Sequence, residues 1–169
     1  MTEQAENHKF NGLMDHPLTY QQYFQLEYGA HFIPYLKILE KEIGREKVLE
    51  TLETLAIEEA RKYADHVRAQ GNCDLSVFRN TYNPAVPEFN QILSIEILEN
   101  TDKIYEIKIT ECIWAKTFRD ADAAEFGLAA VCAGDAPFAR FISPNIDCEL
   151  TGTCMEGKPF CILRYYLKS

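Results

Sequence analysis

The apolar residues of this chain change their spacing once, near residue 90. Before that point they recur every three or four residues, which is the spacing of an amphipathic helix. After it they alternate with polar residues over 93–97 and 105–109, which is the spacing of strands that bury one face. Because helices come first and strands follow, the pattern predicts an α+β fold.

The first half is predicted to hold three helices and a short fourth. Thr19 and Gln22 have the spacing of a capping box, so the first helix is expected to begin after Thr19 and to end at Gly29. The second is expected up to Gly44, the third over about 45–70, and the short one, capped by Asp74, over 75–81. The third helix is expected to turn one stripe inward: Val48, Leu52, Leu55, Ala56, Glu59, Tyr63 and Val67.

The second half is predicted to form a small antiparallel sheet. One hairpin joins 93–97 to 105–109 through a turn at 100–102, and another joins 147–151 to 160–167. A broken helix over 113–142 separates them, and Asp135 is expected to cap its last segment. The predicted fold class is α+β, with N-terminal helices packed on a small, about four-stranded antiparallel sheet and a helical insert between the two hairpins.

Length and charge limit the organisation of the chain and its partners. The 169 residues suffice for one domain. We expect a flexible N-terminal arm over 1–16 and a single α+β domain over 17–169, with a helical half (17–83) and a sheet half (90–169) that carries the cysteine motifs. The net charge of −9 is spread along the chain, which argues against nucleic acid and anionic membranes, because both need basic patches. The first residues lack the pattern of a signal peptide, so a cytoplasmic location with reduced thiols is expected.

Five of the six cysteines lie in the last third of the chain: Cys112, Cys132, Cys148, Cys154 and Cys161. Their spacing contains no C-x-x-C, so zinc-ribbon, thioredoxin-like and haem-attachment motifs are absent. Most single cysteines are small buried apolar residues. Cys112 is expected where a strand gives way to a helix, where the helix dipole would lower the pKa of its thiol. Packing beneath Trp114 is an equally weighted alternative.

Several polar residues are candidates for a site, each with a structural alternative. Asp135 caps a helix or orients water or a substrate ammonium group. Asn145 belongs to a Ser-Pro-Asn turn or supplies an amide to a developing anion. Glu156 is an exposed loop residue or a general base. Three arginines are surface residues or anchors for a substrate carboxylate: Arg119, Arg140 and Arg164.

Five segments of the last third carry a resemblance to a known family. They are 111–118 (ECIWAKTF), 131–135 (VCAGD), 143–145 (SPN), 151–157 (TGTCMEG) and 160–161 (FC). In this order they resemble the L-2-amino-thiazoline-4-carboxylic acid hydrolase family. That family is in turn distantly similar to the ligand-binding domains of the vinyl-reductase and haem–nitric-oxide type, which implies helices over an antiparallel sheet.

The resemblance implies a hydrolase that opens a cyclic amidine or isothiourea, such as L-2-amino-thiazoline-4-carboxylate, by adding water at an amidine-like carbon. It places Cys112, Cys132 and Cys161 around the pocket, with Asp135 and Asn145 beside them. Cys112 or Cys132 would be the nucleophile or a metal ligand, and Asp135 would position water. No cofactor is required by the sequence, and a divalent metal held by the three cysteines is one option.

The same relation leaves a rival function open, a non-catalytic small-molecule-binding or sensory domain whose cysteines line a pocket. Both functions require a small-molecule partner and neither requires nucleic acid or a membrane. A homodimer through the aromatic face near Tyr20, Tyr23 and Tyr28 is a further option, with core packing as its alternative.

Overall fold

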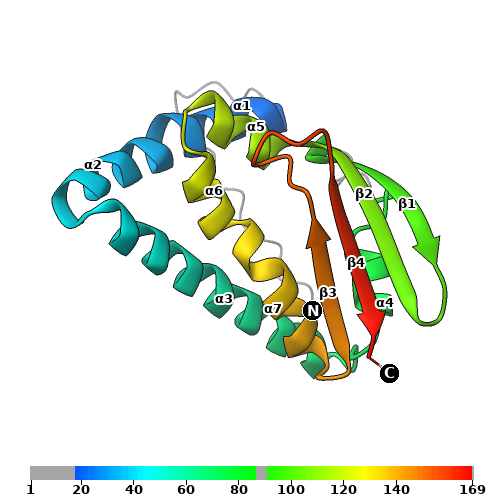
Figure 1. Cartoon of the computed structure of the whole chain (residues 1–169). Helices are drawn as coiled ribbons and strands as arrows, with labels where there is room; N and C mark the ends of the chain where they lie inside the picture. The colour runs from blue at the N-terminus through cyan, green and yellow to red at the C-terminus, as the bar shows by residue number, and fades with distance from the viewer. Residues whose placement is uncertain (1–17, 87–90, 169) are drawn as a thin grey trace, which may run out of the picture.

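A four-stranded antiparallel sheet with helices packed against it forms the framework (Figure 1). The computed structural model describes residues 18–86 and 91–168. The strands are β1 (Leu93–Asn100), β2 (Ile104–Cys112), β3 (Ile146–Thr151) and β4 (Cys161–Leu167), in the order β1-β2-β4-β3. The α+β class with a four-stranded sheet is therefore confirmed. The arm expected over 1–16 lies outside the described residues.

The helices precede the first hairpin and fill the insert between the two hairpins (Figure 1). The first group is α1 (Tyr20–Phe24), the π-helical η1 (Gln25–Phe32), α2 (Ile33–Ile43), α3 (Arg45–Ala69) and α4 (Ser76–Thr81). The insert holds α5 (Ile113–Asp120), α6 (Ala124–Ala130), the 3-10 turn η3 (Cys132–Gly134) and α7 (Asp135–Ile142). None of the described helices has the length and apolar character needed to cross a bilayer.

The first three segments form one uninterrupted helical rod. The capping box is present: Gln22 N donates to Thr19 Oγ1 at 3.2 Å, and Thr19 N donates to Gln22 Oε1 at 2.9 Å. The prediction that the first helix ends at Gly29 is wrong, because the helix continues through η1 into α2. The rod ends at Gly44, where φ is +86°. A π-helical segment widens the turn and shifts the facing side chains, and here Tyr28 meets Trp114.

The predicted inward stripe of α3 is only partly buried. Val48, Leu52 and Val67 are buried as expected, but Leu55 is 49% exposed and Tyr63 is 50% exposed. These two side chains, with the exposed Glu59, border a groove between α3 and the insert. Periodicity marks the side of a helix that meets other side chains, but it does not distinguish a packed core from an open apolar groove.

Two buried clusters meet at the cysteines. One cluster lies between the sheet and helices α3, α4 and α7, where Tyr165 stacks on Phe78 with ring centroids 4.1 Å apart. The other lies among α2, α3 and the insert, around Phe118 and Met155. Cys112 and Cys161 pack against both clusters. We call this junction the thiol seam.

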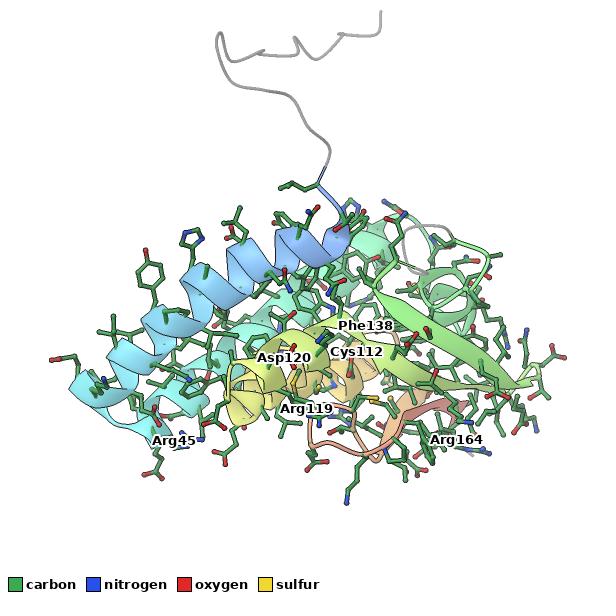
Figure 2. All side chains as sticks on the ribbon, turned by 90° about the horizontal axis from the view of Figure 1, so that it is seen from above. Arg45, Cys112, Arg119, Asp120, Phe138 and Arg164 are labelled. Atoms are coloured by element: carbon green, nitrogen blue, oxygen red, sulfur yellow. The ribbon has the colours of Figure 1, made fainter. Side chains whose placement is uncertain are left out.

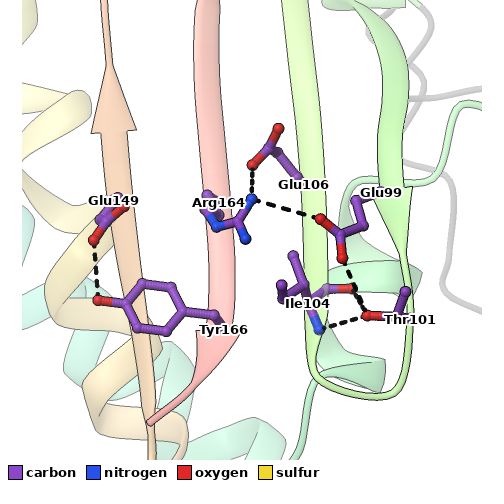
Figure 3. A network of polar contacts seen from close by, with 7 residues as sticks. All are labelled: Glu99, Thr101, Ile104, Glu106, Glu149, Arg164 and Tyr166. Carbon is purple, nitrogen blue, oxygen red and sulfur yellow. Dashed lines mark hydrogen bonds and ion pairs between the residues drawn. The ribbon is translucent and has the colours of Figure 1, made fainter. Parts of the chain in front are cut away.

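The outer face of the sheet carries a row of charges (Figure 3). Glu106, Arg164 and Glu149 are cross-strand neighbours. Arg164 forms ion pairs with Glu106 and, at 3.5 Å, with Glu99. Opposed glutamates repel each other across a sheet, and a cation between them removes that cost. Arg164 is thus engaged in cross-strand ion pairs on the outer face of the sheet.

The packing of α6 yields a stability prediction. A Cβ added at Gly127 would overlap the Met155 side chain and lie 2.9 Å from Phe118 Cγ. We expect Gly127→Ala to lower the free energy of unfolding by about 1–3 kcal/mol, because overpacking forces these side chains to shift. Denaturant unfolding followed by circular dichroism measures the change.

Gly29→Ala is the matched control. An added Cβ there meets no atom closer than Thr117 Cγ2 at 4.0 Å, and Gly29 lies within a helical rod. Alanine should be neutral or stabilising by up to about 1 kcal/mol. Equal destabilisation by the two substitutions would contradict the packing argument.

Candidate functional site

Cys112 stands at the last position of β2 and caps α5. Its Sγ accepts a hydrogen bond from Ala115 N at 3.5 Å, as an N-cap side chain does. The predicted position of Cys112, where a strand gives way to a helix, is confirmed. Here the chain passes directly from β2, which pairs with β1 and β4, into α5. Regular backbone therefore holds the thiol from both sides. A side chain in this position is well placed to meet a ligand with little loss of conformational freedom.

The electrostatics of Cys112 differ from the prediction. Burial in the seam raises the pKa of the Cys112 thiol, and the amides of Ala115 and Trp114 lower it by less. The helix dipole therefore acts, but desolvation of the thiolate outweighs it. Cys112 is held as a neutral thiol at neutral pH.

The other predicted cysteines gather around Cys112. Asp135, Cys112 and Cys161 all add to the effect of burial in raising the pKa of Cys132. Burial likewise raises the pKa of Cys161 to about 12. The three thiols are thus close enough to influence one another, and each is neutral because a thiolate would be poorly solvated there.

Cys154 belongs to the same seam, although the loop position made it a weaker candidate from sequence. It is buried, and its backbone N donates to Cys161 Sγ at 3.0 Å. Its own thiol lies 3.5 Å from the carbonyl of Ile109. The turn through Gly152 and Gly157, both at positive φ, folds the loop back onto the insert and carries Cys154 inward.

A metal site at the three cysteines is not supported. Among residues 18–86 and 91–168, no group of three or more His, Cys, Asp or Glu side chains is placed to hold a metal ion.

A cleft of about 750 Å³ opens beside Cys112. Cys112 at the N-cap of α5 and Lys116 and Arg119 within it are spaced four and three residues apart, so they share one helix face, and all three line the cleft. Figure 2 shows Cys112 and Arg119 on this part of the chain. The opposite walls come from the first hairpin and the loop after β3: Leu93, Ser94, Thr110, Glu111, Cys154, Gly157, Lys158 and Pro159. We call this hollow the Cys112 cleft.

Of the three candidate arginines, only Arg119 lines the Cys112 cleft. Arg140 pairs with Asp147 at 2.9 Å, and Arg164 is engaged on the outer face of the sheet. Arg119 donates to the carbonyl of Cys154 at 3.4 Å and lies over Gly157. Within the described part of the chain it has no carboxylate partner. Its guanidinium can therefore receive a carboxylate from a ligand.

Lys116 is not among the residues that the sequence analysis predicts for the site, although its i, i+4, i+7 spacing with Cys112 and Arg119 is a signal that points to it. Lys116 also pairs with Asp120 at 2.5 Å on the same helix. Lys158, which lies in the loop, carried no local pattern that could have identified it.

Asp135 opens to a different hollow. It lines an apolar groove of about 510 Å³ between α3, η1 and the insert, on the side of α5 that carries Trp114 and Phe118. It does not cap α7 as predicted, because its side chain makes no capping hydrogen bond and the N-cap residue is Gly134. Burial raises the pKa of Asp135 to about 7. It influences Cys112 and Cys132 electrostatically but does not line the Cys112 cleft. Cys132 and Cys161 are not among the described residues that line this cleft either.

The remaining candidates lie apart from the cleft. Asn145 is exposed and precedes β3, at the opposite end of the β3–β4 pair from Cys161. Glu156 is exposed, with Oε2 accepting from Thr153 Oγ1 at 3.0 Å within its own turn. Tyr20 and Tyr23 are exposed on α1, whereas Tyr28 packs against Trp114 with centroids 4.9 Å apart. Core packing thus accounts for Tyr28.

Comparison with known proteins adds a family. The family model described as L-2-amino-thiazoline-4-carboxylic acid hydrolase matches residues 23–165. Among curated proteins no match is found. Among solved structures the chain is similar to a trafficking protein particle complex subunit 3 from Naegleria fowleri covalently bound to palmitic acid. That alignment has 13% identity and a TM-score of 0.47, and it covers 88% of this chain and 95% of that one.

The unusual pKa of Asp135 yields a prediction about stability. The Asp135 carboxyl has a pKa of about 7 in the folded protein, whereas the value expected for the unfolded chain is 3.8. Ionisation of this carboxyl is therefore less favourable in the folded state than in the unfolded state. Stability therefore falls as pH rises from about 4 to about 7, and the full penalty remains above that range. We expect Asp135→Asn to raise the free energy of unfolding at about pH 8 by up to about 4 kcal/mol, with the gain vanishing toward pH 4. Denaturant titrations across this pH range measure it.

Asp65→Asn serves as the control, because this substitution removes the same formal charge from a side chain on α3 that is 64% exposed. It should change stability little at any pH. A gain for Asp135→Asn that did not depend on pH would show that ionisation of the carboxyl is not its source.

Proposed function

The chain belongs to the L-2-amino-thiazoline-4-carboxylic acid hydrolase family, and on this premise we propose that it opens a small cyclic amidine or isothiourea that carries a carboxylate. The Cys112 cleft is the proposed site. The observation that carries the proposal is that Cys112 and Arg119 line the same cleft from one face of α5.

The carboxylate of the substrate is proposed to bind Arg119. A guanidinium without a carboxylate partner among the described residues binds this group with two parallel hydrogen bonds. Lys158 lines the same cleft and adds positive charge, whereas the charge of Lys116 is paired with Asp120, which also lines the cleft. Arg119 lies two helical turns along α5 from Cys112, so an anchored ring would extend along the helix toward the thiol.

The neutral state of Cys112 suits an amidine substrate. The thiol adds to the carbon between the ring sulfur and the two nitrogens of the unprotonated amidine, and its proton passes to an amidine nitrogen, which is more basic than the nitrogen of an amide. The ring C–S bond then breaks, its electron pair stays on the ring sulfur, and that sulfur takes up a proton to become a free thiol. No separate base is needed, because the substrate accepts the proton that burial keeps on Cys112.

Water completes the proposed reaction. It adds to the carbon that is bonded to Cys112, and the Cys112 sulfur leaves with a proton. The product is a ureido acid that carries a free thiol, and one water is consumed for each ring that opens. Cys154, which lines the cleft, is proposed to form part of the wall of the site. Asp135 opens to the groove and takes no part in these steps.

Binding without turnover is a second candidate function. It is favoured by the raised pKa values of Cys112, Cys132 and Cys161, because neutral thiols are weak nucleophiles. It predicts that native mass spectrometry detects a retained carboxylate-bearing ligand and that no substrate is consumed.

Activity measurements with L-2-amino-thiazoline-4-carboxylate test the first function. We expect release of one free thiol for each substrate consumed, measured with a thiol reagent and corrected for the protein's own cysteines. Cys112→Ser should lower kcat/KM by about a thousandfold or more, because serine keeps the helix cap but is a far weaker nucleophile. Unchanged activity of Cys112→Ser would rule out this nucleophile.

Variants of Arg119 test the carboxylate anchor. Arg119→Gln should raise KM by about tenfold to a hundredfold, because a hydrogen bond to a charged group contributes about 1.5–3 kcal/mol. It should leave the reaction of the decarboxylated ring, 2-amino-thiazoline, unchanged. Arg140→Gln is the matched control, since Arg140 is paired with Asp147 outside the cleft. An equal effect of the two variants would contradict the proposed anchor.

A further inference from the structure

The groove that contains Asp135 is a second hollow of ligand size. Its volume of about 510 Å³ lies within the range of small-molecule sites. It is walled by α3, by η1, by α5 and by the start of α7. The side of α5 that faces it is opposite to the side that lines the Cys112 cleft, so the two hollows share a helix but no described lining residue.

Aromatic side chains make up much of the wall of this groove. Trp114 packs edge-to-face against Tyr28 with ring centroids 4.9 Å apart. Tyr63 stacks on Phe138 on another wall, at 5.3 Å. Phe32, Phe118 and Tyr82 complete the aromatic lining. Aromatic faces attract cations through the ring quadrupole, and the attraction grows when water is excluded.

The charged groups of the groove are all acidic. Glu27, Glu59 and Asp135 line it, and among its described lining residues there is no lysine, arginine or histidine. Glu59 is paired with Lys62 at 2.6 Å on the outer surface of α3. Such a lining disfavours an anionic ligand and favours a cation.

The Asp135 carboxyl lacks a counter-ion. Within residues 18–86 and 91–168, no other group forms a hydrogen bond or an ion pair with this carboxyl. Desolvation is the cause of its raised pKa, with no compensating donor. Asp135 is half-buried and lines the groove, so a cationic ligand in the groove can reach its carboxyl and pair with it.

We propose that this groove binds a small flat organic cation of the amidinium or guanidinium class, with Asp135 as its counter-ion and the aromatic rings as its walls. A planar amidinium presents two N–H donors on one edge, which matches the two oxygens of a carboxylate. The rest of the ligand, if aromatic or aliphatic, is buried between Trp114, Tyr63 and Phe138. This site is separate from the proposed hydrolase cleft and does not depend on it.

Binding is expected to depend on pH through Asp135. The titratable groups near it on the surrounding elements are Glu27 and Tyr28 (η1), Glu59 and Tyr63 (α3), Tyr82 (after α4), Cys112 (end of β2), Cys132 (η3), Cys148 (β3) and Tyr165 (β4). None of these described groups is a base that would carry positive charge. The affinity for a permanent cation should therefore rise about tenfold between about pH 6 and about pH 8, as the carboxyl ionises.

Benzamidine is a suitable probe, because it is a flat amidinium that stays charged across this pH range. Trp114 is the sole tryptophan of the chain and lines the groove, so its fluorescence reports binding directly. We expect saturable quenching or a spectral shift with benzamidine. The neutral isostere benzamide should bind at least about tenfold more weakly, because it cannot form the ion pair.

The full-length Asp135→Asn protein should bind benzamidine at least about tenfold more weakly than the natural chain and lose the pH dependence. Asp65→Asn, which removes an equal charge on exposed α3, should bind as the natural chain does. Equal affinity for benzamidine and benzamide, unaltered binding by Asp135→Asn, or no fluorescence change with either probe would overturn the proposal. The benzamide comparison uses the natural chain, so it decides the matter even where the variant fails to fold. Loss of hydrolase activity in Cys112→Ser would not alter any of these results.

Discussion

Burial of the thiol seam is the constraint on which the rest of the site depends. Cys112 and Cys161 pack against both buried clusters, so the sheet cluster and the insert cluster are joined through small sulfur-bearing side chains. This burial makes each thiolate unfavourable and keeps Cys112, Cys132 and Cys161 neutral. A reaction at Cys112 must then use a substrate that can accept its proton. An amidine meets that condition, whereas an ordinary amide, which is far less basic, does not.

Helix α5 divides the chemistry of the molecule. One face presents Cys112 and Arg119 to a cleft that suits a carboxylate, and the other presents Trp114 and Phe118 to an acidic, aromatic groove. Two neighbouring hollows with opposite charge preference can be formed from a single eight-residue helix, because residues three or four apart share a face and adjacent residues do not. The loop after β3, in which Gly152 and Gly157 adopt positive φ, forms one wall of the cleft.

Much of the fold could be predicted because each element has its own period. The capping box at Thr19, the hairpin after residue 93 and the helical insert all follow local rules of spacing and turn chemistry. The end expected at Gly29 failed because packing of the rod against Trp114 and Phe118 outweighs the small cost of one glycine. The prediction that Leu55 and Tyr63 of α3 are buried is wrong, because periodicity identifies an apolar helix face but does not show which residues cover that face.

The sequence by itself determined the α+β class, the family and the thiol at the start of α5, since these rest on local spacing and short motifs. Only the tertiary structure decided which candidates share a site. It brings Cys154 to the seam, leaves Arg119 as the one candidate arginine that lines the Cys112 cleft, and places Asn145 at the far end of the sheet. The tertiary structure also raises the pKa values of the Cys112 thiol and the Asp135 carboxyl by burying both groups. The pKa of a thiol or carboxyl depends on the side chains packed around it in space, and residues distant in the sequence supply that environment.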